Sequence, residues 1–137
     1  MKEDLNAFIE LSLQEDVREG DHTSLACIPP TASGKAQLLV KENGILAGME
    51  VALAIFKKVN PDIQFFPLMH DGESMTVGDV AFIVEGPSSS ILTAERLVLN
   101  CMQRMSGIAT KTQHIVKLLE GTKAQVLDTR KTTPGIR

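Results

Sequence analysis

The residues best suited to chemistry lie in one polar stretch at the end of the sequence, residues 128–137. Three cations and three hydroxyls stand there: Thr129, Arg130, Lys131, Thr132, Thr133 and Arg137. An arginine presents a planar fork that matches a carboxylate, and a lysine presents a point charge that suits a phosphate. This composition predicts a site for a phosphate or a dicarboxylic acid. It fits a basic surface loop without a ligand equally well.

A second candidate is Arg96, which stands in a helical pattern with apolar neighbours on both sides. An arginine that is partly buried needs a partner for its charge. The residues alone favour a structural ion pair with Glu95 or a neighbouring carboxylate over a role in ligand binding.

Two weaker signals do not develop into sites. His22 follows a run of acidic residues at 15–21, but no second histidine stands at ligand spacing, so a solvated loop capped by Asp and Ser is favoured over a metal site. The Gly-Asp turns of residues 71–86 resemble the hairpin of lipoyl and biotinyl carrier domains, yet the lysine that those domains modify is missing. His70 fits an exposed turn.

Composition bounds the class of protein. The 137 residues are 43% hydrophobic and 23% charged, as is usual for a globular domain, and the net charge of −3 does not attract nucleic acid or an anionic membrane. The acidic residues 1–5 lack the apolar region of a signal peptide, so none is expected here, and no apolar run reaches the ~20 residues that a membrane helix needs. Two distant cysteines, Cys27 and Cys101, fit reduced thiols in the cytoplasm.

Hydrophobic periodicity predicts the elements that must position these residues. Helices are expected over 3–14 and 49–59, and strands over 35–41, 45–47, 63–69, 74–77 and 80–85, with Asn43-Gly44 forming a hairpin turn between the first two strands. A helix over 91–105 should break at Ser106-Gly107, and a second helix over 108–120 should expose an apolar face. A last strand, 124–128, then leads into the polar loop.

Five blocks of the sequence, taken in order, resemble the bacterial quinolinate phosphoribosyltransferases, also called nicotinate-nucleotide pyrophosphorylases. The blocks are Glu15-Asp16 with Gly20–Ser24, Lys41–Gly48, Glu95–Asn100, Gln103–Thr110 and Asp128–Arg137. The Ser-Gly-Ile-Ala-Thr and Thr-Arg-Lys-Thr-x-Pro-Gly segments are the most specific of them. The blocks run over nearly the whole sequence.

The resemblance implies an α+β fold, with an α/β open-faced sandwich followed by the beginning of an incomplete α/β barrel. It divides the chain into a sandwich domain over residues 1–105 and the start of the barrel over residues 106–137. The N-terminal helix could pack on the barrel.

The resemblance also implies a function in NAD biosynthesis. Phosphoribosyl would pass from phosphoribosyl pyrophosphate to quinolinate with loss of CO₂, giving nicotinate mononucleotide and pyrophosphate. Thr129, Arg130 and Lys131 match the family's substrate-binding positions, and Arg96 matches an arginine that one subunit of a homodimer donates to the other. Mg²⁺ is the implied cofactor.

One departure concerns length. A complete barrel needs ~200 residues or more, and the Mg²⁺ ligands and the remaining catalytic residues are expected beyond Arg137. We therefore expect this chain to be a fragment that is inactive alone, with half a binding site. Two alternatives stay open: a non-catalytic α+β dimerisation module, and a paralogous phosphoribosyltransferase that acts on another acid.

Overall fold

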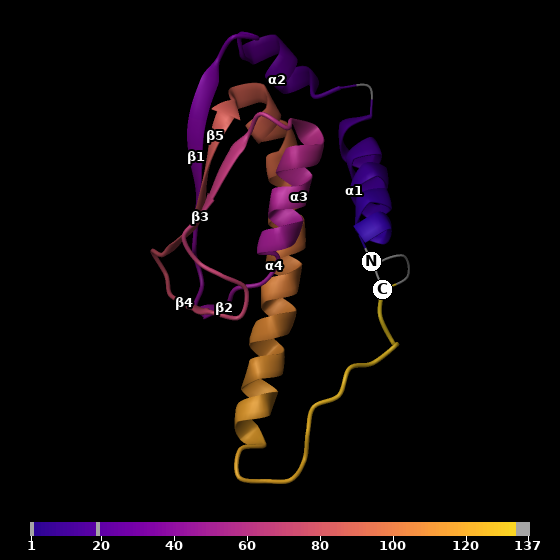
Figure 1. The fold of residues 1–137 in the computed structure, drawn as a ribbon, viewed down its shortest axis with the longest axis vertical. Helices are drawn as coiled ribbons and strands as arrows, with labels where there is room; N and C mark the ends of the chain where they lie inside the picture. The colour runs from indigo at the N-terminus through magenta and orange to yellow at the C-terminus, as the bar shows by residue number, and fades with distance from the viewer. Residues whose placement is uncertain (1, 19, 134–137) are drawn as a thin grey trace.

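The computed structural model describes residues 2–18 and 20–133, in which helices and short strands are mixed along the chain (Figure 1). The predicted α+β class is confirmed. In chain order the elements are α1 (Lys2–Val17), α2 (His22–Cys27), β1 (Ser33–Leu39), β2 (Gly44–Ile45), α3 (Met49–Val59), β3 (Gln64–Pro67), β4 (Ser74–Met75), β5 (Val80–Pro87) and α4 (Ser88–Leu118). The end of the predicted binding loop, residues 134–137, lies outside the described residues.

A three-stranded antiparallel sheet, in the order β1-β5-β3, forms one layer. Its central strand pairs Val84 with Ala36 of β1 and with Phe65 of β3. Because side chains alternate between the faces of a strand, Phe82 and Val84 share the buried face, along which α3 and α4 lie in Figure 1. The opposite face carries the ion pair of Lys35 with Glu85, with Nζ and Oε1 2.8 Å apart.

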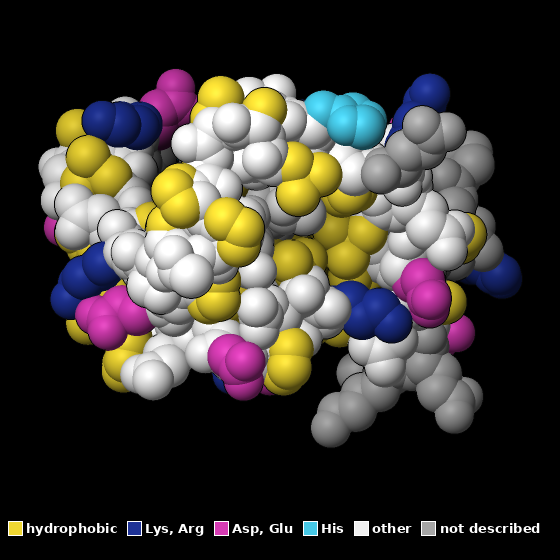
Figure 2. All heavy atoms as spheres, turned by 90° about the horizontal axis from the view of Figure 1, so that it is seen from above, with side chains coloured by type: hydrophobic (Ala, Val, Ile, Leu, Met, Phe, Trp, Pro, Cys, Tyr) yellow, Lys and Arg dark blue, Asp and Glu magenta, His cyan; other side chains and the backbone are white. Residues whose placement is uncertain are grey.

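The core lies between this sheet and the helices. Three aromatic rings meet there, Phe56 of α3, Phe65 of β3 and Phe82 of β5, with ring centroids 4.6 to 6.1 Å apart. Edge and tilted contacts of this kind add to the burial of apolar area. The predicted helix over 49–59 is confirmed with the same bounds, and its apolar stripe is the face that enters the core. Seen end-on, hydrophobic side chains gather in the hollowed middle of the surface, with charged ones towards its edge (Figure 2).

The predicted hairpin between residues 35–41 and 45–47 is wrong. β1 pairs with β5, and the short strand β2 pairs with β4 in a separate two-stranded sheet. Asn43 does turn the chain, but its side-chain Oδ1 accepts a hydrogen bond from the backbone N–H of Val77, at 2.9 Å. This contact with a distant segment directs the chain away from β1.

The predicted break at Ser106-Gly107 is also wrong, because α4 continues unbroken through both residues. The helices predicted over 91–105 and 108–120 are two parts of one 31-residue helix. Ser106 is buried and points at the β2 segment, while Gly107 lies on the open side with no atom near the position of its missing Cβ. Tertiary packing has here overridden the weak helix propensity of serine and glycine.

Two further predictions need correction. The stretch predicted as a solvated loop contains a short helix, α2, which begins at His22 and has Asp21 as its N-cap. The predicted strand over 124–128 is absent from the described chain, where these residues form no regular element. A strand is stable only when a neighbour takes up its backbone hydrogen bonds, and the described residues offer this segment none.

The predicted apolar exposure of the second part of α4 is confirmed. Ile108 is 59% exposed and Leu118 is 70% exposed. An isolated helix of this character gains most of its stability from burying such a face. In the described part of the chain, no helix has both the length and the apolar character that crossing a membrane requires.

The close approach of β2 to α4 gives a stability prediction. A Cβ added at Gly44 would lie 2.5 Å from the Thr110 hydroxyl oxygen, so Gly44→Ala should destabilise the fold by about 1–3 kcal/mol. The control is Gly107→Ala, which lies on α4 near Thr110 but in open space and should stabilise the fold by roughly 0.5–1 kcal/mol. Urea unfolding of both variants measures whether the free energy of unfolding falls in Gly44→Ala and rises in Gly107→Ala. A Gly44→Ala variant as stable as the wild type would contradict this packing.

Candidate functional site

Two of the sequence blocks are in direct contact through hydroxyl groups. The Thr110 hydroxyl accepts a hydrogen bond from the backbone N–H of Ile45, at 2.9 Å, and donates to the Ser106 carbonyl, at 2.7 Å. The Ser106 hydroxyl bridges both backbone groups of Ala47, at 3.0 and 3.2 Å. The Ser-Gly-Ile-Ala-Thr segment therefore holds the Lys41–Gly48 segment by its backbone, which is a structural role.

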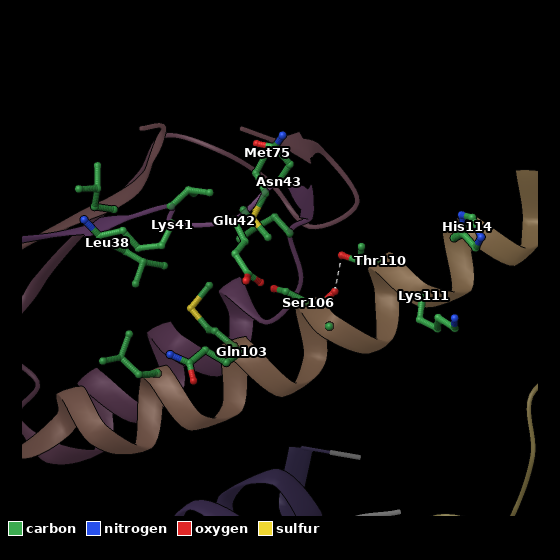
Figure 3. A pocket seen from close by; sticks show the side chains of 16 residues that line it. Leu38, Lys41, Glu42, Asn43, Met75, Gln103, Ser106, Thr110, Lys111 and His114 are labelled. Atoms are coloured by element: carbon green, nitrogen blue, oxygen red, sulfur yellow. Dashed lines mark hydrogen bonds between the residues drawn. The ribbon is translucent and has the colours of Figure 1, made fainter. Parts of the chain in front are cut away.

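A groove of about 830 Å³ opens beside this contact, between the end of β1 and α4 (Figure 3). Its polar rim includes Lys41 from the sheet side and Gln103, Lys111 and His114 from α4. None of the four predicted site residues lines it. The groove is thus distinct from the predicted substrate site.

Arg96 lies on the outer face of the first part of α4, with 56% of its side chain exposed. Its Nε is 3.2 Å from Oδ2 of Asp16, in the last turn of α1. The predicted ion pair is thus present, and its partner is Asp16 rather than Glu95. The contact is made at Nε, on the stem side of the guanidinium.

A second carboxylate, that of Asp21, belongs to the same charged region. It accepts hydrogen bonds from the Ser24 hydroxyl, at 2.7 Å, and from the Ser24 backbone N–H, at 3.2 Å. These two bonds lower the pKa of Asp21 below 3.8, and the positive charge of Arg96 lowers it further, because each favours the ionised form. Asp21 therefore stays ionised at neutral pH, and its negative charge acts on Arg96.

The predicted substrate loop is exposed and bonds largely to itself. The backbone N–H of Thr129 donates to Asp128 Oδ1 at 2.6 Å, and that of Lys131 donates to the Thr129 hydroxyl at 3.2 Å. Thr132 donates to the carbonyl of Arg130 at 3.0 Å. These three amides already have acceptors inside the loop, so they are not available to an anion.

The loop meets α4 at Arg104, whose Nη2 donates to the Thr133 hydroxyl. Arg104 stands eight residues after Arg96, about 12 Å further along the helix. In the described part of the chain, no hydrogen bond or ion pair joins Arg96 to residues 129–133. The structure therefore does not bring the predicted site residues together within one chain.

Sequence reasoning missed Asp16 and Arg104 as partners of the predicted site. Asp16 carried a signal, because it stands in one of the blocks that suggested the family. The contact itself could not be predicted from the sequence, since Asp16 and Arg96 are 80 positions apart and lie on different helices. Among the described residues, no group of three or more His, Cys, Asp or Glu side chains could hold a metal ion. These residues do not fit a Mg²⁺ site.

Comparison with known proteins decides the family. The model for the N-terminal domain of quinolinate phosphoribosyl transferase matches residues 21–106, and the model for its C-terminal domain matches residues 108–137. The first match alone covers more than half of the chain. This chain belongs to the quinolinate phosphoribosyltransferase family.

Relatives and solved structures agree with this assignment. Quinolinate phosphoribosyltransferase [decarboxylating] 1b of Nicotiana tabacum is 43% identical over 135 residues, which are 98% of this chain and 38% of that protein. A probable nicotinate-nucleotide pyrophosphorylase of Synechocystis is 35% identical over 97% of this chain and 45% of its own length. The crystal structure of NadC from Streptococcus pyogenes matches with a TM-score of 0.93 and 34% identity, over 98% of this chain and 48% of its own. The chain thus spans less than half the length of these family members.

The Asp21 cap gives a pH-dependent prediction. Its folded pKa is lowered, so Asp21 stabilises the fold above pH 3.8, and that contribution disappears as the pH falls through the lowered value. Asp21→Ala should therefore be less stable than the wild type at neutral pH, with the difference vanishing in acid. Thermal unfolding across this range measures it, and Ser24→Ala should reduce the same difference. A difference that persists unchanged in acid would contradict the assignment.

Proposed function

We propose that the complete protein transfers phosphoribosyl from phosphoribosyl pyrophosphate to quinolinate, with loss of CO₂, in NAD biosynthesis. The observation that carries the proposal is the match to both domains of the family over residues 21–106 and 108–137. The products are nicotinate mononucleotide, CO₂ and pyrophosphate. The ring nitrogen forms the new bond to the anomeric carbon of the sugar, and the bond to pyrophosphate breaks.

The chemistry of quinolinate fits the cations of this chain. Quinolinate is a planar dianion, which suits the fork of Arg96 or Arg130 better than a point charge does. Lys131 and the Thr129 hydroxyl suit phosphate oxygens. Loss of CO₂ leaves negative charge on the ring, and nearby cations stabilise such charge as it develops. We assign substrate binding to Arg96, Thr129, Arg130 and Lys131.

The site is proposed to be shared between two copies of the chain in a homodimer. The side chain of Arg96 is 56% exposed, and its ion pair is with Asp16 rather than with the described part of its own substrate loop, residues 129–133. In an isologous dimer with a shared site, a surface residue of each subunit lies in the site of the other subunit, so the same contact occurs twice. Arg96 would then complete the site that Thr129, Arg130 and Lys131 begin on the second subunit.

Other expectations remain proposals. The division into residues 1–105 and 106–137 places the domain boundary inside α4, which is continuous there. A requirement for Mg²⁺ is proposed for the complete protein only, and none of the steps assigned to these residues depends on it. Cytoplasmic location is likewise proposed.

The first test is an assay of the complete protein with quinolinate and phosphoribosyl pyrophosphate, following nicotinate mononucleotide and CO₂. Nicotinate and other pyridine acids serve as competing substrates. We expect turnover with quinolinate and none from the 137-residue chain, which spans less than half the length of its relatives. Selective turnover of another acid would replace this proposal with the paralogous activity, and turnover by the short chain would contradict the shared, incomplete site.

The second test is Arg96→Ala in the complete protein. Loss of a bidentate, charge-assisted contact should weaken quinolinate binding roughly a hundredfold. The control is Lys35→Ala, which removes another exposed cation, one that pairs with Glu85 on the sheet. Calorimetric titration with quinolinate measures both variants. Unchanged binding in Arg96→Ala would return Arg96 to a structural role.

A further inference from the structure

The proposed role of Arg96 raises the question of what holds its long side chain in place. An arginine carries a large rotamer entropy, and an exposed one presents its fork in many directions. Affinity for a rigid, planar ligand improves when that freedom is removed before binding. Something on this chain should therefore fix the guanidinium on its inner side and leave the outer edge open.

Asp16 meets that requirement by its place on α1. Its side chain is 31% exposed, compared with 56% for the side chain of Arg96. The helix that carries it is fastened to the body of the fold, because Ile9 is fully buried in the core cluster and Leu5, Phe8 and Leu13 pack against that cluster. The carboxylate of Asp16 is thus supported by a docked helix and does not swing freely as an isolated surface group would.

The atoms used in the contact also matter. Asp16 meets the guanidinium at Nε, on the stem side of the group. A guanidinium binds a carboxylate bidentately either along its Nε edge or along the edge of its two Nη groups. With the first edge directed at Asp16, the second edge keeps its donors for a carboxylate from outside. The contact orients the fork without consuming the edge that a ligand needs.

The surroundings on α2 strengthen this arrangement. Asp21, fixed by its two hydrogen bonds to Ser24, adds a second negative charge whose field reaches Arg96. The guanidinium is therefore in contact with the carboxylate of Asp16 on α1, and the charge of Asp21 acts on it from the start of α2. The residues matched by the family's N-terminal model begin at 21, so Asp16 lies outside them.

We propose that Asp16 is a positioning residue, which holds Arg96 through Nε so that its Nη edge faces a carboxylate of the substrate in the neighbouring subunit. This inference rests on the proposed function of Arg96. Asp16 itself touches no substrate. An ordinary surface ion pair adds little to stability. The pair of Asp16 with Arg96 should instead change the affinity for quinolinate.

The test uses Asp16→Asn in the complete protein, which removes the charge and keeps the shape. The KM for quinolinate should rise about tenfold, which corresponds to one lost charge-assisted orientation. The KM for phosphoribosyl pyrophosphate and the melting temperature should stay close to wild type. The matched control is Glu10→Gln, which removes a different ion pair of α1, to Lys58 at 3.6 Å, and should change neither KM.

Two further variants keep the outcome decisive. Asp16→Glu retains the charge but displaces it by one methylene, so it should give an intermediate KM, and it carries the test alone if Asp16→Asn does not fold. In an Arg96→Ala background, Asp16→Asn should have no additional effect on quinolinate binding. A double-mutant cycle of this form isolates the coupling between the two residues.

Each alternative result has a distinct meaning. If Arg96→Ala weakens quinolinate binding and Asp16→Asn does not, the positioning role is wrong and the proposed function of Arg96 stands. If Asp16→Asn strengthens binding, its carboxylate only repels the dianion, and the inference is overturned. If Arg96→Ala leaves binding intact, both proposals fail together. Equal effects of Asp16→Asn and Glu10→Gln on both substrates would show a structural role only.

Discussion

The arrangement of this chain depends on the hydrogen bonds by which two hydroxyls of α4 hold the backbone of the β2 segment. Ser106 and Thr110 satisfy the backbone groups of Ala47 and Ile45 where no strand neighbour does so on that side. Such bonds need the backbone of the segment to lie against the helix surface. Glycine at positions 44 and 48 permits that approach, and Gly48 also adopts φ 109°, a region that other residues avoid.

This contact explains why α4 continues where its sequence suggests a break. The side of the helix that carries Ser106 is occupied by a partner segment, so its serine side chain has partners outside the helix and does not compete for the helical backbone bonds. The unbroken helix then carries different surfaces along its length. Arg96 stands in its first part, beside α1 and α2, and exposed apolar residues occupy its second part.

Local patterns were sufficient to predict much of the fold. The stripe of α3 predicted its bounds, and the strand predicted over 80–85 is present as β5. Pairing was not predictable from the same patterns: Asn43-Gly44 fits a tight hairpin, but the bond from Val77 to Asn43 joins segments 34 residues apart. The strand expected over 124–128 failed for a related reason, since strand propensity has no effect without a neighbouring strand.

In the candidate site too, the sequence predicted which residues are involved but not which contacts they make. The types and order of Thr129, Arg130 and Lys131 were enough to suggest an anion site, because the sequence itself gives the charge and hydrogen-bonding groups of each side chain. The ion pair of Arg96 with Asp16 could not be predicted from the sequence, since it depends on how α1 packs on the rest of the fold through buried residues such as Ile9. The loop's use of its own amides, through Asp128 and Thr129, likewise follows from its conformation alone.

The central claim is that Arg96 acts on the substrate loop of a second subunit, and subunit complementation tests it most directly. Complete protein carrying Arg96→Ala is mixed with complete protein carrying Lys131→Ala, each nearly inactive alone, under conditions that exchange subunits. If the site is shared, each mixed dimer holds one intact site, and activity should return to about a quarter of the wild-type value, as random pairing in an isologous dimer requires. Mixed dimers that form and stay inactive would contradict the account.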